Sequence, residues 1–220
     1  MLDRASLATG ADPIRAEQAH IHVVDDDASV RSALARLLRS GSYLVSAFPS
    51  AESFLADAEP DTHGCLILDF AMPGSNGLTL QQTLSDSGIP LPVIFLTGHA
   101  DVPMCAQAMK RGAVDFLTKP VDESQLFSAV TRALAQDRMS RQARSIREDT
   151  DARLATLTPR ERQVLAQVVA GRLNKQIAYD LGTAEKTIKV HRARCMEKMH
   201  VRSVAELVRM VERAHPDEER

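Results

Sequence analysis

The stretch PVIFLTGHADVPMCAQAMKRGAVDFLTKP, residues 92–120, contains one complete repeat of the pattern that decides the fold. It includes two short apolar runs, PVIFLT (92–97) and AVDFLT (113–118). Both are too short for a helix and are rich in residues that favour buried strands. Between them, VPMCAQAMKRG (102–112) has apolar residues every three to four positions and ends at a glycine, which is typical of an amphipathic helix. The stretch therefore predicts a strand, a helix and a second strand.

The same alternation extends from residue 20 to residue 137. The five apolar runs are HIHVV (20–24), YLVSAF (43–48), CLIL (65–68), PVIFLT (92–97) and AVDFLT (113–118). Strands that alternate with helices form a parallel sheet with helices on both faces. We therefore predict an α/β domain at 20–137 that is doubly wound, five-stranded, parallel and flavodoxin-like.

The pattern changes after residue 137. Residues 138–153 are polar and arginine-rich without an apolar stripe, which predicts a linker that is part helical. Only helical patterns follow over 154–213, where we expect a small all-α domain of four helices. Residues 1–19 are expected to form a flexible arm and residues 214–220 a polar tail.

Capping and turn residues define the helices of the second domain. Thr158, Pro159 and Glu161 stand where a capping box and a helix start require them. Gly171 ends this first helix, and Gly182 separates the second from the third. Short helices joined by a tight glycine turn indicate a helix-turn-helix module.

The composition excludes several classes of protein. The chain has 220 residues, of which 44% are hydrophobic and 25% charged, as in globular proteins and unlike disordered or collagen-like chains. Its length suits two domains better than one. No apolar run approaches the roughly 18–20 residues of a membrane-spanning helix. The N-terminal sequence contains acids and no hydrophobic region, so it does not resemble a secretory signal.

Charge separates the two parts of the chain. Residues 1–150 contain 13 Lys and Arg against 19 Asp and Glu, whereas residues 151–220 contain 14 against 10. A basic second part suggests binding to nucleic acid, although ordinary variation in surface charge would give the same asymmetry. Cys65, Cys105 and Cys195 have no CxxC spacing, which favours reduced thiols and a cytoplasmic protein.

Five side chains able to handle a phosphoryl group stand at or just after the ends of predicted strands: Asp25, Asp26, Asp69, Thr97 and Lys119. The carboxyl ends of parallel strands share one edge of a sheet, so we expect these groups to converge. Crowded carboxylates favour Mg²⁺, for which Mn²⁺ could substitute. A lysine and a hydroxyl beside them indicate phosphoryl transfer, with Asp69 as the nucleophile. Any one of these acids could be only a turn residue or a helix cap; the whole set favours a phosphoryl site.

Residues 20–137 closely resemble the receiver domain of a two-component response regulator of the FixJ type. The motifs VVDDD, LDFAMPGSNG and VIFLTGHADVPMCAQAMKRGAVDFLTKP account for the resemblance. It implies that Asp69 is the phosphoacceptor. It also implies that Asp26, Asp69 and the Ala71 carbonyl bind Mg²⁺ directly, while Asp25 assists through water.

The resemblance also implies how the phosphoryl group is sensed. Thr97 and Lys119 would contact it, and the Lys119–Pro120 peptide would be cis. Phe116 would turn inward together with Thr97 as an aromatic switch. The domain would assist only its own phosphotransfer and dephosphorylation, so the chain is not expected to be an enzyme acting on another substrate.

The third helical pattern of the second part, over 184–200, has two unlike faces. Ile188, Cys195 and Met199 share the apolar face. The opposite face and its flank carry Lys186, Lys189, Val190, Ala193, Arg194 and Lys198. A helix in the major groove of DNA needs such a cationic outer face, although a solvated amphipathic helix shows the same pattern. The preceding short helix, the glycine turn and the local positive charge favour DNA.

Residues 154–211 resemble the LuxR-type output domain. The motifs LTPRERQVLAQVVAGRLNKQIAYDLG, TIKVHRARCMEKM and VRSVAELVRM account for this resemblance. It implies that Lys189, Val190 and Ala193 face base edges. It further implies phosphate contacts from Lys175, Thr187, His191, Arg194 and Lys198. For His191, a half-buried contact between helices is an equally good interpretation.

These observations predict a bacterial response regulator that acts as a transcription factor. Its expected partners are a cognate sensor histidine kinase, double-stranded promoter DNA, RNA polymerase and a second copy of itself, and not a membrane. Phosphorylation would remodel the face at roughly 102–137 and pair two receivers as a homodimer.

Two other classes of function remain open. One is a dehalogenase-type phosphatase. Such an enzyme needs a second acid two residues after its nucleophile, and this chain has Ala71 there. The other is a DNA-binding protein independent of phosphorylation, with the receiver as a scaffold.

Overall fold

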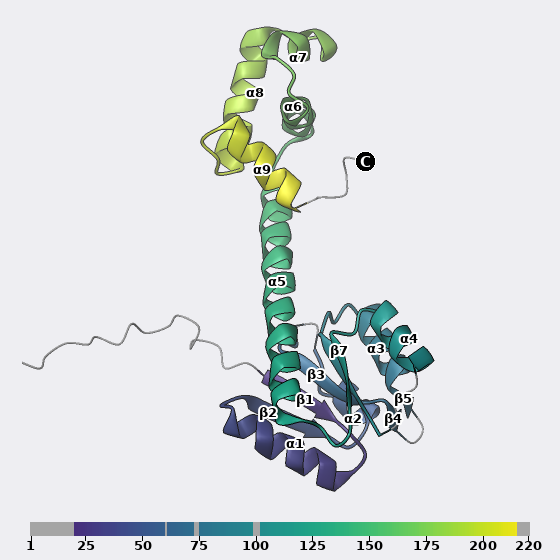
Figure 1. Ribbon diagram of the computed structural model, residues 1–220. Helices are drawn as coiled ribbons and strands as arrows, with labels where there is room; N and C mark the ends of the chain where they lie inside the picture. The colour runs from purple at the N-terminus through teal and green to yellow at the C-terminus, as the bar shows by residue number, and fades with distance from the viewer. Residues whose placement is uncertain (1–19, 60, 73–74, 99–101, 215–220) are drawn as a thin grey trace, which may run out of the picture. The chain divides into compact units, whose positions relative to one another are not determined.

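The computed structural model describes residues 20–59, 61–72, 75–98 and 102–214, so the expected arm at 1–19 and residues 215–220 of the expected tail lie outside the described residues. The chain folds as two compact units, Met1–Arg138 and Met139–Arg220 (Figure 1).

The first unit contains a parallel sheet of five strands, as predicted. In chain order the strands are β1 (His20–Val24), β2 (Leu44–Phe48), β3 (Cys65–Asp69), β6 (Val93–Thr97) and β7 (Asp115–Thr118). They lie side by side in the order β2-β1-β3-β6-β7. The helices of this unit are α1 (Ala28–Ser40), α2 (Ala51–Leu55), α3 (Gly77–Asp86), α4 (Val102–Lys110) and the first part of α5 (Glu123–Ala155). A short antiparallel pair, β4 (Ala71–Met72) and β5 (Ser75–Asn76), was not predicted.

Each face of the five-stranded sheet has its own apolar cluster. Ile21 and Val23 of β1 pack with residues of α1 and α5, whereas Val24 packs with residues of α2, α3 and α4. Figure 1 shows α1 and α5 on one side of the sheet and α3 and α4 on the other. Because both faces are covered, the strands are continuously apolar rather than alternating. This arrangement confirms the doubly wound fold.

The strand order changes direction where the acidic residues lie. Strand β1 lies between β2 and β3, so the chain proceeds from β1 to one side and later returns to the other. Such a change of direction separates the connections at the carboxyl ends of the two central strands. Asp25 directly follows β1, Asp69 ends β3, and Thr97 ends the neighbouring β6.

Helix α5 contains residues of both units. It runs through 138–153, the segment interpreted as a part-helical linker. At the end of the first unit, the buried side chain of Asp137 accepts a hydrogen bond from the Gly64 amide at 3.2 Å. Gly64 has a φ of 106°, and a Cβ there would lie 1.8 Å from the His20 carbonyl oxygen, so only glycine fits.

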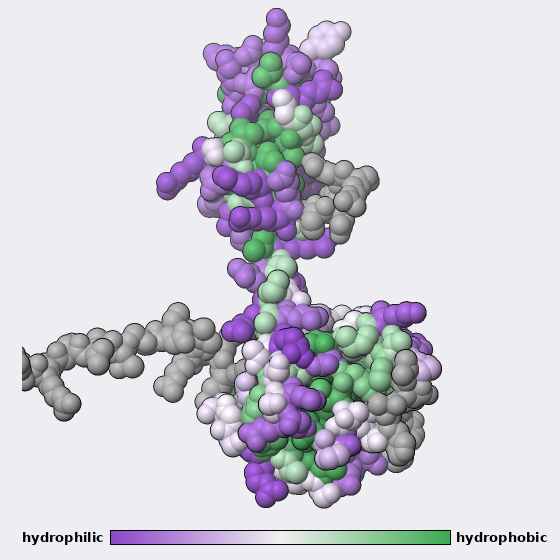
Figure 2. Space-filling model, in the orientation of Figure 1, coloured by the Kyte–Doolittle hydropathy of each residue, from purple (hydrophilic) through white to green (hydrophobic). Residues whose placement is uncertain are grey.

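The second unit contains the four expected helices: α6 (Pro159–Val169), α7 (Asn174–Asp180), α8 (Glu185–Lys198) and α9 (Val204–Ala214). Thr158 and Glu161 form the predicted capping box at the start of α6. Figure 2 shows the apolar side chains of this unit gathered between its helices, with hydrophilic side chains around them. None of the helices in the described part of the chain is both long and apolar enough to cross a membrane.

His22 is a buried titratable group in the sheet. It lies 6% exposed in β1, stacks on His20 with ring centroids 4.4 Å apart, and meets the ring of Phe54 at 5.5 Å. Burial, reinforced by the neighbouring His20, lowers the pKa of His22 to about 4. The folded first unit therefore keeps this imidazole neutral.

We predict that His22 makes the first unit sensitive to acid. The unfolded chain binds the proton at an ordinary pKa of 6.5, so the free energy of unfolding falls as the pH drops from about 6.5 toward 4. At pH 5 the loss relative to pH 7 is about 2 kcal/mol. Denaturant unfolding at both pH values measures it, and His22→Phe should remove most of it.

His63→Gln provides the control for this test. It retains the His63 carbonyl, which lies 3.3 Å from His22 Nε2, and removes only the smaller charge effect of the His63 ring, so it should keep most of the wild-type pH dependence. Equal pH dependence in His22→Phe and wild type would contradict the prediction.

Candidate functional site

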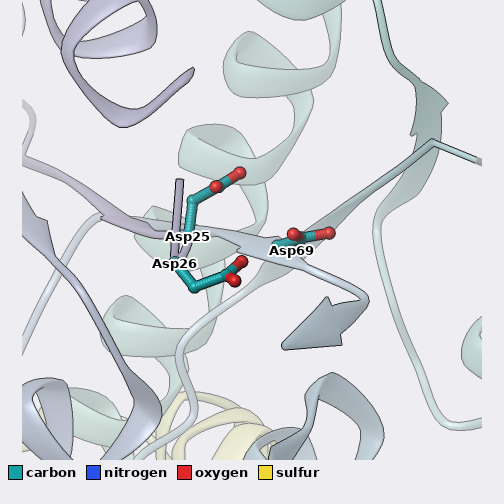
Figure 3. Close-up of side chains that lie close together, drawn as sticks. All are labelled: Asp25, Asp26 and Asp69. Atoms are coloured by element: carbon teal, nitrogen blue, oxygen red, sulfur yellow. The ribbon is translucent and has the colours of Figure 1, made fainter. Parts of the chain in front are cut away.

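Three carboxylates converge at the carboxyl edge of the sheet. Ligand atoms of Asp25, Asp26 and Asp69 all lie within 4.8 Å of one another (Figure 3). Asp25 is fully buried and Asp69 is 6% exposed, whereas Asp26 is open to solvent. The cluster thus combines two fixed acids with one accessible acid.

Lys119 is the cation that faces this cluster. Its Nζ lies 2.6 Å from Asp25 Oδ2 and 3.0 Å from Asp69 Oδ2. The Lys119 amide donates to the Thr97 carbonyl at 2.7 Å, which ties the segment after β7 to the end of β6. The Lys119–Pro120 peptide is cis, as the resemblance implies.

The first turn of α1 holds Asp25 in place. The Asp27 amide donates to Asp25 Oδ1 at 2.9 Å, and Arg31 Nη1 donates to the Asp25 carbonyl at 2.6 Å. Asp27 itself caps α1 by accepting hydrogen bonds from the Ser29 and Val30 amides. Arg31 was not identified from the sequence, because its contact is with a backbone oxygen and follows no side-chain pattern.

The charges of the cluster are not balanced. Burial raises the pKa of Asp25 even though Lys119 lies beside it. Burial alone would lower the pKa of Lys119, but its hydrogen bonds to Asp25 and Asp69 raise it. Three acids therefore share one cation. Oxygen donors at this spacing, one of them exposed, fit a divalent metal ion such as Mg²⁺.

Other predicted site residues lie around the cluster. The Ala71 amide donates to Asp69 Oδ1 at 3.3 Å, so Ala71 follows the acid closely. Thr97 is 2% exposed at the end of β6. Phe116 is half-buried in β7, with its ring centroid 5.9 Å from that of Phe70 and 6.2 Å from that of Phe95. A rotation of Phe116 would thus change contacts within the α3–α4 side of the core.

Helix α8 shows the two predicted faces. Ile188, Cys195 and Met199 are buried in the core of the second unit. The residues predicted to contact DNA that are exposed on α8 are Lys186, Thr187, Lys189, Val190, Ala193 and Arg194. Lys175 of α7 is exposed as well. Val190 is 47% exposed, so its side chain is available for contact with a base edge.

Two predicted DNA contacts lie differently. His191 is half-buried, and its Nδ1 is enclosed without a hydrogen-bond partner in the described residues. Lys198 Nζ lies 2.7 Å from Glu161 Oε2 and donates to the Thr156 carbonyl at 3.0 Å. These contacts join the end of α8 to the start of α6. They favour a structural role for Lys198 over the predicted phosphate contact.

Comparison with known proteins gives two family matches. Residues 21–131 match the response regulator receiver domain, and residues 155–211 match the bacterial regulatory proteins of the luxR family. The two matched ranges contain the acidic cluster and the basic face of α8.

Individual relatives match most of the chain. Nodulation protein W of Bradyrhizobium diazoefficiens is 45% identical over 195 residues, which cover 89% of this chain and 86% of that protein. Transcriptional regulatory protein FixJ of Rhizobium meliloti is 45% identical over 190 residues, covering 86% and 93%. The solved structure of the response regulator StyR superposes with a TM-score of 0.79 at 45% identity, covering 89% of this chain and 99% of that one.

The Lys198–Glu161 pair generates a prediction for the second unit. The hydrogen bond from Lys198, with that from the Thr158 amide, lowers the pKa of Glu161 to about 2. We expect Lys198→Met to lower the thermal stability of the second unit. The slope of log affinity for duplex DNA against log salt should not change, because this charge already faces Glu161.

Lys189→Met is the matched control. Among the described residues Lys189 pairs with Glu185 alone, at 3.2 Å on the exposed surface, and such pairs are weak. Loss of a phosphate-facing or groove-facing cation should reduce the salt slope by about one. If Lys198→Met reduced the slope as much as Lys189→Met, Lys198 would be a phosphate contact after all.

Proposed function

The chain belongs to the two-component response regulators that join a receiver domain to a LuxR-family DNA-binding domain, and we propose that Asp69 is the residue through which it is switched. The protein is a phosphorylation-dependent transcriptional regulator of a two-component system. The observation that supports Asp69 as the acceptor is its position. It ends a central strand, is 6% exposed, and lies 3.0 Å from the cation of Lys119.

The transfer uses the side chains of the cluster directly. A carboxylate oxygen of Asp69 attacks the phosphorus of the phosphohistidine of a sensor kinase, the phosphorus–nitrogen bond breaks, and the electron pair returns to the histidine ring. Lys119 already lies beside the attacking group and neutralises charge that moves onto the phosphoryl oxygens.

Asp25, Asp26 and Asp69 would hold Mg²⁺, together with the Ala71 carbonyl that the resemblance implies. The bound ion would neutralise phosphoryl oxygens during the transfer. Asp25 keeps its orientation through the bonds from Asp27 and Arg31, so the site is formed before the kinase arrives. Mn²⁺ would fit the same oxygen donors.

The signal then passes to the outer strands of the sheet. Thr97 would close on the phosphoryl group, Phe116 would turn inward, and the face at roughly 102–137 would pair two receivers. Phosphorylation shifts the equilibrium between monomer and dimer only if the phosphoryl group stabilises the paired receivers more than it stabilises the single receiver. Dimerisation therefore supplies the difference in DNA affinity between the two forms.

The paired output domains would bind a two-fold related promoter site. Lys186, Lys189, Val190 and Ala193 face the major groove in this proposal, and Lys175, Thr187 and Arg194 face phosphates. We assign the protein to the cytoplasm, where promoter DNA and RNA polymerase lie, with RNA polymerase as a further partner.

Phosphorylation at Asp69 is tested by intact mass. The full chain, incubated with a small acyl phosphate and Mg²⁺, should gain one phosphoryl group, and Asp69→Asn should gain none. Asp86→Asn, at an exposed acid of α3 that accepts a hydrogen bond from Gln82, is the matched control and should behave as wild type. A phosphoryl group on Asp69→Asn would overturn the assignment.

The metal site makes a separate prediction about Lys119. In Lys119→Met the three acids lose their shared cation, so the variant should be less stable than wild type without metal. Mg²⁺ should stabilise the variant more than the wild type; at a hundredfold excess over the variant's own dissociation constant, the variant gains about 2–3 kcal/mol in total. Thermal unfolding with and without Mg²⁺ measures this difference.

Lys110→Met, at the exposed end of α4, controls for a general loss of positive charge. It should respond to Mg²⁺ as the wild type does. If Mg²⁺ did not stabilise Lys119→Met, the cluster would not be a metal site; an equal gain in Lys119→Met and Lys110→Met would instead show that Lys119 does not compete with the ion.

A further inference from the structure

Tyr179 is a large side chain that the fold does not use. It lies on α7 and is 88% exposed, while its neighbours Ile177 and Ala178 are buried in the core of the second unit. The only other tyrosine of the chain, Tyr43, instead packs against Phe127 with ring centroids 6.2 Å apart. The packing of the second unit therefore does not explain Tyr179.

Tyr179 lies close to residues that are proposed to bind DNA. Lys175 precedes it by four residues, which places both side chains on one face of α7, with Cβ atoms about 5–6 Å apart as in any helix. Arg192 Nη1 donates to Asn174 Oδ1 at 3.0 Å and so ties the start of α7 to the middle of α8. The start of α7, where Lys175 and its exposed side chain lie, is therefore held against the helix that carries the basic face.

Asp180, which directly follows Tyr179 in the sequence, does not repel a DNA phosphate strongly. Asp180 Oδ2 lies 3.2 Å from Arg172 Nη1, so its negative charge is paired within the domain. A phenol donates a hydrogen bond to a phosphate without adding charge. In helix-turn-helix proteins the first helix crosses the DNA backbone while the second lies in the major groove.

We propose that the Tyr179 hydroxyl donates a hydrogen bond to a DNA phosphate on the strand that Lys175 contacts. The inference rests on the proposed DNA-binding function and extends it by assigning α7 a neutral contact beside its cationic one. This contact positions the domain on the backbone and does not distinguish one base sequence from another.

The test compares Tyr179→Phe, which removes only the hydroxyl, with wild type. Binding of the acyl phosphate-treated full chain to a fluorescent duplex of random sequence is measured by anisotropy over a range of salt concentrations. Tyr179→Phe should weaken binding about three- to tenfold at each salt concentration without changing the salt slope. Lys175→Ala should reduce the slope by about one, and Tyr43→Phe should behave as wild type.

A second measurement reports the contact itself. With 3-fluorotyrosine incorporated, the chain gives two fluorine signals, which Tyr179→Phe and Tyr43→Phe assign. Added duplex should shift the Tyr179 signal and leave the Tyr43 signal unchanged.

The outcomes separate the inference from the function on which it rests. Wild-type affinity in Tyr179→Phe, with an unshifted fluorine signal, would overturn the inference alone. Loss of promoter activation with unchanged DNA binding would also overturn it, because Tyr179 would then contact a protein such as RNA polymerase. A wild-type chain that binds no duplex would overturn the proposed DNA-binding function itself.

Discussion

The bridge from Lys119 to Asp25 and Asp69 is the interaction on which the receiver depends. It joins the ends of three strands that are far apart in the sequence, and it exists only because the strand order brings their carboxyl ends to one edge. Two apolar clusters, one on each face of the sheet, fix those strands. The buried core therefore determines the geometry of the acids.

Much of this arrangement could be predicted from the sequence because it depends on local patterns. Short continuous apolar runs separated by amphipathic stretches predicted all five strands of the parallel sheet, and the acids at their ends predicted where a site would form. The β4–β5 pair (71–72 and 75–76) was missed because strands of two residues have no periodicity. The full length of α5 was uncertain for a related reason: residues 138–153 have no apolar stripe. Ion pairs one turn apart, such as Arg153 with Asp149 at 2.8 Å, support the helix there.

Contacts between elements that are distant in the sequence could not be predicted from it. A helical wheel of α8 shows that Lys198 stands at the edge of the cationic face, but it cannot show that Glu161 of α6 lies 2.7 Å away. It likewise cannot show that Arg31 donates to the backbone of Asp25. Periodicity indicates which side of a helix faces solvent; only the packing of two helices decides whether a cation on that side already has a partner.

The charge of the acidic cluster explains why phosphorylation of one residue can act on distant strands. Three carboxylates face one lysine, so the unmodified edge has an excess of negative charge that a divalent ion would neutralise. On the proposed mechanism, a phosphoryl group on Asp69 would replace a carboxylate by a bulkier group with more charge, and the arrangement of cations around it would change. Lys119, the cation that would move with the phosphoryl group, donates a hydrogen bond from its backbone amide to the Thr97 carbonyl at the end of β6. Thus the two outermost strands on this side, β6 and β7, are the part of the sheet that a change of charge at Asp69 reaches first.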